Sequence, residues 1–203
     1  MDITAYEKEL NAMGLYNIAG VDEVGRGPLF GPVVAACVVL PNDFEIKGIN
    51  DSKKISDKKR RELYNYIKDN AIDYSISSID ASKIDEINIY QATKLAMINA
   101  IDDVSKRVNI EHVLIDAMKL DLDIPSTSII KGDSKSLSIA AASILAKVYR
   151  DELMEEIDLK HPEYGFKNHK GYPTKKHIEA INKYGLIDGY RKSFKPVSDV
   201  LSK

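Results

Sequence analysis

In the stretch AGVDEVGRGP, residues 19–28, two adjacent acids stand between a short apolar run and a glycine turn. In a β-strand, neighbouring side chains point to opposite faces, so Asp22 and Glu23 cannot both face solvent on one open surface. One of them must be held by a positive group, and a divalent metal is the simplest candidate, because buried carboxylates need a cation or a partner. The alternative is a strand end with two ordinary surface acids.

The composition favours a chain with one sizeable core. It has 203 residues, of which 44% are hydrophobic, and a net charge of -2, which gives no overall sign of nucleic-acid binding. The charge is nevertheless uneven. From Lys160 onward, ten basic and four acidic residues give a net charge of +6, and a second basic cluster lies between Lys53 and Arg61. Such clusters are either solvated faces or contacts for a polyanion.

Cysteine usage and hydropathy indicate a cytoplasmic protein. The single Cys37 lies in an apolar run and reads as a small buried thiol, so no disulfide framework can form within the chain. No segment approaches the roughly 18 apolar residues of a membrane span. The N-terminus lacks the charged and then apolar layout of a signal peptide.

Hydrophobic periodicity predicts an α/β domain with a basic C-terminal extension from about residue 160. The run 32–40 is continuously apolar and predicts a strand buried on both faces, whereas 74–79 alternates and predicts an exposed strand. Leu63, Tyr64, Ile67 and Ile72 form the apolar stripe of one helix. The expected helices cover 3–13, 56–70, 84–104 with an interruption near Asn88, 136–156 and 175–184. The expected strands cover 17–23, 32–40, 74–79, 112–115 and 127–130. Residues 164–174 are expected to form a loop, and the C-terminal end is expected to be irregular.

Acids follow three of these strands, at the edge where α/β folds gather their sites. Asp116 closes one apolar run, and Asp133 follows another and precedes a helix. Taken singly, Asp116 could be a turn residue and Asp133 a helix N-cap. Taken with Asp22 and Glu23, they form an oxygen-only set without a nearby His or Cys, which suits Mg²⁺ or Mn²⁺. Several acids can hold two such ions roughly 3.5 to 4 Å apart, an arrangement used for in-line attack on phosphodiesters. The sequence contains no dinucleotide fingerprint, phosphate loop or nucleophile elbow.

In its ordered motifs the chain resembles ribonuclease HII, the type 2 ribonuclease H family. The resemblance runs from about residue 17 to 197, and the set is specific because the motifs occur in family order. They are GVDEVGRGP (20–28), NDSKK (50–54), IDEINI (84–89), LID (114–116), KGDS (131–134), AASILAK (141–147) and HKGYPT (169–174). Ala117 stands where many members have glycine.

The resemblance implies a ribonuclease H fold, a mixed sheet of five strands flanked by helices with a helical C-terminal part. It also implies roles for individual residues. Gly25, Arg26 and Gly27 match the segment whose backbone recognises the ribose 2′-OH, which separates RNA from DNA. Tyr172 matches a tyrosine that stacks on the sugar after the ribonucleotide, and Lys53 and Ser134 are expected to contact phosphates. The metal-binding catalytic carboxylates correspond to Asp22, Glu23, Asp116 and Asp133.

The implied activity is a metal-dependent endoribonuclease using Mg²⁺ or Mn²⁺ on two substrates, RNA–DNA hybrids and duplex DNA that contains ribonucleotides. Family members cut 5′ to a ribonucleotide and leave 3′-OH and 5′-phosphate ends, and they are typically monomers. Residues 198–203 show no clamp-binding peptide, so recruitment by a sliding clamp has no visible motif. Two alternatives are a preference for long hybrids, as in ribonuclease HIII, and a non-catalytic hybrid-binding module. Arg26 and the short N-terminal segment disfavour the first, since HIII typically has lysine there and an added N-terminal domain. The four acids disfavour the second, because uncompensated acids would repel phosphates.

Overall fold

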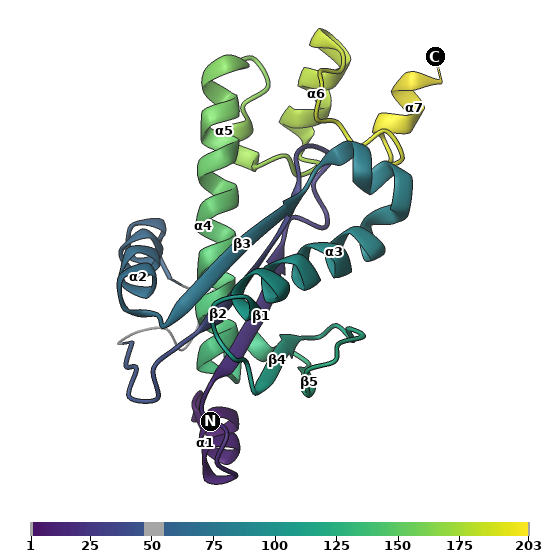
Figure 1. Cartoon of the computed structure of the whole chain (residues 1–203). Coiled ribbons are helices and arrows are strands. Elements are labelled where there is room, and N and C mark those ends of the chain that lie inside the picture. Colours follow the sequence, from purple (N-terminus) through teal and green to yellow (C-terminus); the bar gives the residue numbers. More distant parts are fainter. Residues whose placement is uncertain (1, 47–54, 203) are drawn as a thin grey trace.

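A five-stranded mixed sheet crosses the molecule with helices on both faces (Figure 1), as a ribonuclease H-like fold requires. The computed structural model describes residues 2–46 and 55–202, so Lys53 and the NDSKK motif lie outside the described residues. The strand order is β3-β2-β1-β4-β5, with β1 antiparallel to β2 and parallel to β4. The strands are β1 (Ile18–Val24), β2 (Val33–Val39), β3 (Asp73–Ile79), β4 (His112–Asp116) and β5 (Ser126–Ile129).

Strand β1 is the centre of the sheet, and its alternating side chains meet different helices. Ala19 and Val21 belong to the core formed with α3 (Ala81–Ser105). On the other face, α4 (Leu137–Lys160) lies against Gly20, where an added Cβ would stand 2.1 Å from the carbonyl carbon of Ser138. Glycine therefore lets the helix backbone touch the strand. The small residues that precede Ser143 on α4 are fully buried, as expected for a helix lying close to a sheet.

The predicted elements form with small shifts at their ends. Strand β2 is fully buried, which confirms the prediction from its continuous apolar run. Helix α2 (Asp57–Asn70) begins at its N-cap Ser56 and packs beside α4, while α1 (Ala5–Ala12) lies at the opposite end from the C-terminal helices (Figure 1). The predicted break in α3 is real: Asn88 has φ 68° and ψ 163°, and its Oδ1 accepts a hydrogen bond from the Gln91 N–H at 3.1 Å.

Three expectations need correction. Strand β3 is an edge strand but half-buried rather than exposed, since α3 packs on it. Ile72 does not share the buried stripe of α2: it follows the last helical residue and is 49% exposed. The C-terminal part is more regular than predicted, because it contains the short helices α5 (Phe166–His169) and α7 (Val197–Leu201) beside the predicted α6 (Lys175–Tyr184).

The segment after α4 folds around an aromatic core of its own. Four buried rings form this core: Phe30, Tyr164, Phe166 and Tyr190. Phe166 and Tyr190 each contact the other three, and the Phe30 and Phe166 centroids are 4.2 Å apart. Phe30 belongs to the loop between β1 and β2, so this core attaches the C-terminal segment to the loop that begins with Gly25-Arg26-Gly27. Within the described ranges, no helix combines the length and apolar character that crossing a membrane demands.

Candidate active site

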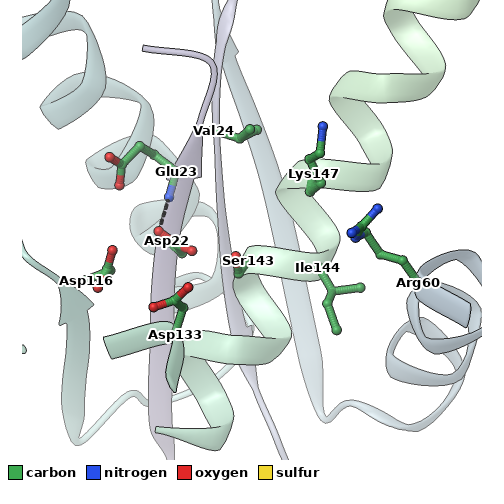
Figure 2. A pocket seen from close by; sticks show the side chains of 9 residues that line it. All are labelled: Asp22, Glu23, Val24, Arg60, Asp116, Asp133, Ser143, Ile144 and Lys147. Carbon is green, nitrogen blue, oxygen red and sulfur yellow. Dashed lines mark hydrogen bonds between the residues drawn. The ribbon is translucent and has the colours of Figure 1, made fainter. Parts of the chain in front are cut away.

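A cleft of about 370 Å³ opens at the end of the central strands, where four predicted carboxylates come together (Figure 2). The acids come from β1, from the end of β4 and from the 3₁₀ turn (Gly132–Ser134) that precedes α4. The cleft is lined by Asp22, Glu23, Val24, Arg60, Asp116, Asp133, Ser143, Ile144 and Lys147.

The register of the sheet places Asp22 of β1 next to Asp116 of β4. The parallel pairing of β1 with β4 runs from Ile18 and His112 to Val21 and Ile115. One step further along both strands lie Asp22 and Asp116. Leu114 packs against Ile139 of α4, and alternation puts the Asp116 side chain on this same face of the sheet. Asp22 also faces α4, where it forms a hydrogen bond with Ser143.

Glu23 reaches the same place from the opposite face of β1. Its backbone N–H donates to Asp22 Oδ1 at 2.7 Å, the dashed line in Figure 2. Strand β4 ends at Asp116, whereas on the other side of β1 Glu23 pairs with Ala35 of β2. One carboxylate oxygen each from Asp22, Glu23 and Asp116 lie within 4.8 Å of one another. The carboxylates of Asp22 and Glu23 therefore come close together although the two residues lie on opposite faces of β1.

Asp133 is buried beside this trio, on the turn that Gly132 makes possible. The Gly132 N–H donates to Asp116 Oδ1 at 2.6 Å, and a Cβ at this position would come within 2.6 Å of Ile139 Cδ1. Asp133 is not the N-cap of α4, because Ser136 caps that helix with its hydroxyl on the Ile139 N–H. Ser134 is exposed, and its hydroxyl donates to the Lys131 carbonyl, so its phosphate contact stays a prediction.

The turn after Asp116 is made without glycine. Ala117 has φ 48°, in the left-handed region, and its N–H donates to the Ile129 carbonyl at 3.0 Å. This conformation costs an L-residue roughly 1–2 kcal/mol relative to ordinary backbone. The departure from the family pattern therefore preserves the turn at some cost in stability.

The carboxylates disfavour one another's ionisation. Burial, followed by the charges of Glu23 and Asp116, raises the pKa of Asp22 well above the ordinary aspartate value. Burial also raises the pKa of Glu23, which Arg26 opposes with its guanidinium 3.6 Å from the carboxylate. A cation bound between these carboxylates would relieve their repulsion and favour their ionised forms.

The donor set fits a hard divalent metal. The site offers carboxylate oxygens in a half-buried cleft, which is the ligand type of Mg²⁺ and Mn²⁺. Glu23 Oε2 is buried and has no hydrogen-bond partner among the described residues. Such an oxygen normally has a partner, and a metal ion supplies one. Asp22, Glu23 and Asp116 are placed to hold it, with Asp133 lining the same cleft.

The predicted ribose-reading segments also lie together. Gly25 has φ 92°, and Arg26 and Gly27 are exposed beyond the end of β1. A Cβ on Gly27 would stand 3.4 Å from Tyr172 Cε1, so the tyrosine ring packs beside this glycine. Tyr172 is 39% exposed, which leaves part of the ring available for contact.

Three polar cleft residues were absent from the predicted site: Arg60, Ser143 and Lys147. Ser143 and Lys147 are four residues apart on α4 and so share one face of the helix. Both lie in the AASILAK motif (141–147), so their spacing within that motif is the signal that could have identified them. Arg60 comes from α2, and no local pattern indicates that α2 packs beside α4 at this point.

Comparison with known proteins places this geometry in a family. The sequence model described as Ribonuclease HII matches residues 19–197. A ribonuclease HII of Bacillus mycoides strain KBAB4 is 56% identical over 203 residues, which are 100% of this chain and 78% of the relative. Among solved structures, the ribonuclease H2 of Pyrococcus horikoshii OT3 is similar with a TM-score of 0.78 and 25% identity, covering 92% of this chain and 97% of that one. Bst-RNase HIII in complex with Mn²⁺ shares the fold, with a TM-score of 0.69, 20% identity and coverage of 92% and 69%.

Proposed function

The chain belongs to the ribonuclease HII family and is an enzyme that hydrolyses the RNA strand of RNA–DNA hybrids, and we propose that it also cuts 5′ to single ribonucleotides embedded in duplex DNA, leaving 3′-OH and 5′-phosphate ends. The observation that carries the proposal is the convergence of Asp22, Glu23 and Asp116 within 4.8 Å, beside a loop whose backbone is exposed next to Tyr172. The first feature suits phosphodiester hydrolysis, and the second suits recognition of a ribose.

Asp22, Glu23, Asp116 and Asp133 are the groups that would hold two Mg²⁺ or Mn²⁺ ions. When bound, such ions activate the attacking water and stabilise the leaving oxygen of an in-line displacement. The chain's own part is to bring the four carboxylates into one cleft and to hold them in place. The Gly132 N–H fixes Asp116, and Ser143 and the Glu23 N–H fix Asp22. Both interactions with Asp22 lower its pKa and so favour the ligand form.

Recognition of the ribonucleotide falls to the Gly25-Arg26-Gly27 backbone and to Tyr172. Glycines allow a sugar to approach the backbone closely, and the tyrosine ring offers a flat surface for the next sugar. Lys53 and Ser134 would contact phosphates of the same strand. Arg60 and Lys147 add positive charge to the cleft, which offsets the repulsion between the carboxylates and the nucleic-acid backbone.

The C-terminal part from about residue 160 belongs to the same functional unit, because it supplies Tyr172. As for other members of the family, we propose that the chain acts as a monomer. Cys37 is the single cysteine and is buried, which suits a reducing compartment such as the cytoplasm.

The test is cleavage of a 5′-labelled DNA duplex carrying one ribonucleotide, with an all-DNA duplex of the same sequence as control. We expect one product, ending in a 3′-OH on the 5′ side of the ribonucleotide, only when Mg²⁺ or Mn²⁺ is present. Cleavage of long hybrids without any cleavage of this duplex would refute the proposal and leave the hybrid activity intact.

A further inference from the structure

Two arginines are completely buried behind the ribose-reading loop. Arg150 of α4 and Arg191 after α6 have no exposed surface. Their hydrogen bonds to the described residues all go to backbone carbonyls rather than to carboxylates. Burial, and for Arg191 also the nearby Arg150 charge, lowers the pKa of both guanidiniums. Burying two like charges is costly, so the contacts that they make must be needed.

Arg191 donates hydrogen bonds to both ends of the loop between β1 and β2. Its Nη2 donates to the Gly25 carbonyl at 2.6 Å, its Nη1 to the Arg26 carbonyl at 2.9 Å, and its Nε to the Gly31 carbonyl at 3.0 Å. One planar guanidinium thus fixes two consecutive peptide groups of the Gly-Arg-Gly segment. The fork geometry of arginine allows this, whereas a lysine ammonium would act as a single point.

These contacts determine where the amide donors point. In a trans peptide, the carbonyl and the following N–H lie in one plane and point in opposite directions. The peptide bonds of this loop are trans, because the cis peptide bond found within residues 2–46 and 55–202 is that between Lys195 and Pro196. Turning the Gly25 and Arg26 carbonyls inward onto Arg191 therefore turns the Arg26 and Gly27 N–H groups outward, at exposed positions. The charge on Arg191 also polarises both peptides, which makes their N–H groups stronger donors.

Arg150 connects this loop to the segment that carries Tyr172. Its Nε and Nη2 donate to the carbonyls of Pro32 and Phe30, each at 3.0 Å, and its Nη1 donates to the Lys170 carbonyl at 2.9 Å. The Leu29 N–H donates to the Gly171 carbonyl at 2.8 Å beside it. One side chain thus fixes the spacing between the backbone donors and the tyrosine ring.

We propose that Arg191 and Arg150 are positioning residues for ribose recognition: Arg191 aims the Arg26 and Gly27 N–H groups at the 2′-OH of the substrate, and Arg150 holds Tyr172 in register with them. The inference rests on the proposed function, since it assigns the frame of the same site. The hydrogen bonds given above for the two arginines do not involve the carboxylates that would hold the metal. The expected defect of a variant is therefore in telling ribose from deoxyribose rather than in metal use.

The test compares the wild type with Arg191→Lys, which keeps the charge and removes the fork. The measured quantities are the KM for a duplex with one ribonucleotide and the inhibition constant of an all-DNA duplex of the same sequence. We expect the ratio of inhibition constant to KM to fall by about tenfold, the value of roughly one misaligned hydrogen bond. The Mg²⁺ concentration for half-maximal rate should stay the same. A general structural defect would instead weaken binding of both duplexes alike.

Arg107→Lys is the matched control. Arg107 also uses its fork, on Asp73 and Asp103, but these contacts lie between β3 and α3 and away from the loop. This variant should keep the wild-type ratio. An unchanged ratio in folded Arg191→Lys protein would overturn the proposal.

A milder variant decides the question if Arg191→Lys does not fold. Asp85 accepts hydrogen bonds from the N–H groups of Lys192 and Ser193, at 2.8 and 2.9 Å, and so fixes the chain next to Arg191. Asp85→Asn should lower the ratio by about threefold, a fraction of one hydrogen bond, with circular dichroism of the wild type. A wild-type ratio in folded Asp85→Asn protein contradicts the proposal. Equal affinity of the wild type for both duplexes would instead refute the proposed function, and the inference with it.

Discussion

Stability at acidic pH should depend on one buried imidazole, that of His177 on α6. The ring has no exposed surface and bridges two residues of the C-terminal segment. Its Nδ1 lies 2.9 Å from the Tyr172 carbonyl, and its Nε2 lies 2.9 Å from the Tyr190 hydroxyl. A carbonyl only accepts, so Nδ1 carries the proton of the neutral ring and Nε2 accepts from Tyr190.

Protonation of this ring is unfavourable in the folded protein. Burial lowers the pKa of His177 from 6.5 to about 4, and the hydrogen bond to Tyr172 only partly opposes this effect. His169 stacks on His177 with ring centroids 4.2 Å apart, and it accepts the Gly171 N–H on its Nδ1. The two neutral rings together hold the backbone of the loop that carries Tyr172.

The sign and size of the effect follow from the two pKa values. Between pH 6.5 and 4 the unfolded chain binds a proton at His177 that the folded chain does not, so acid favours unfolding. Stability is retained above about pH 6.5 and is lost as the pH falls toward the folded value. A shift of this size removes about 2.5 kcal/mol from the free energy of unfolding between pH 7.5 and 4.5.

The measurement is urea unfolding of the wild type and of His177→Asn, at pH 7.5 and 4.5 with chelator present. The variant should be less stable at pH 7.5, because it loses hydrogen bonds. Its own decrease in stability between the two pH values should be smaller than that of the wild type by about 2.5 kcal/mol. His161→Asn, at a partly exposed position, is the control and should keep the wild-type pH dependence. Equal pH dependence in wild type and His177→Asn would refute the reasoning.

Three further predictions concern the active site and the core. Asp133→Asn should abolish turnover on hybrids with an unchanged circular dichroism spectrum, and substantial residual cleavage would exclude Asp133 as a metal ligand. Tyr172→Ala should reduce kcat/KM far more for a single-ribonucleotide duplex than for a long hybrid; an equal loss on both would count against its role at the junction. Gly20→Val should destabilise the fold by about 3 kcal/mol or more in urea unfolding, because a Cβ would stand 2.1 Å from the α4 backbone. A change below about 1 kcal/mol would contradict that close packing.

Local patterns were enough to predict most elements of this fold. The continuous apolar run of β2, the alternation in β3 and the break at Asn88 each depend on residues next to one another in the sequence. The resemblance to ribonuclease HII then supplied the order of the motifs and the five-stranded sheet. Ile72 was misassigned because the helical period continues past the actual end of α2.

Contacts between distant segments could not be predicted in this way. Alternation along β1 places Asp22 and Glu23 on opposite faces, and their meeting with Asp116 was expected from the acids that follow three strands and from the resemblance, not from that alternation. Arg150 and Arg191 look like ordinary surface charges in the sequence. Their burial depends on carbonyls more than a hundred residues away in the chain, which no local pattern reports.

The most direct test of the central claim is hydrolysis of a uniform RNA–DNA hybrid by the wild type and by Asp22→Asn, each with Mg²⁺, with chelator, and with Mg²⁺ restored in excess. The account predicts that chelator stops the wild-type reaction, that restored Mg²⁺ revives it, and that Asp22→Asn is inactive throughout although folded. Hydrolysis that persists in chelator, or a wild-type rate in Asp22→Asn, would contradict the assignment of the carboxylate cluster as the metal-dependent catalytic centre.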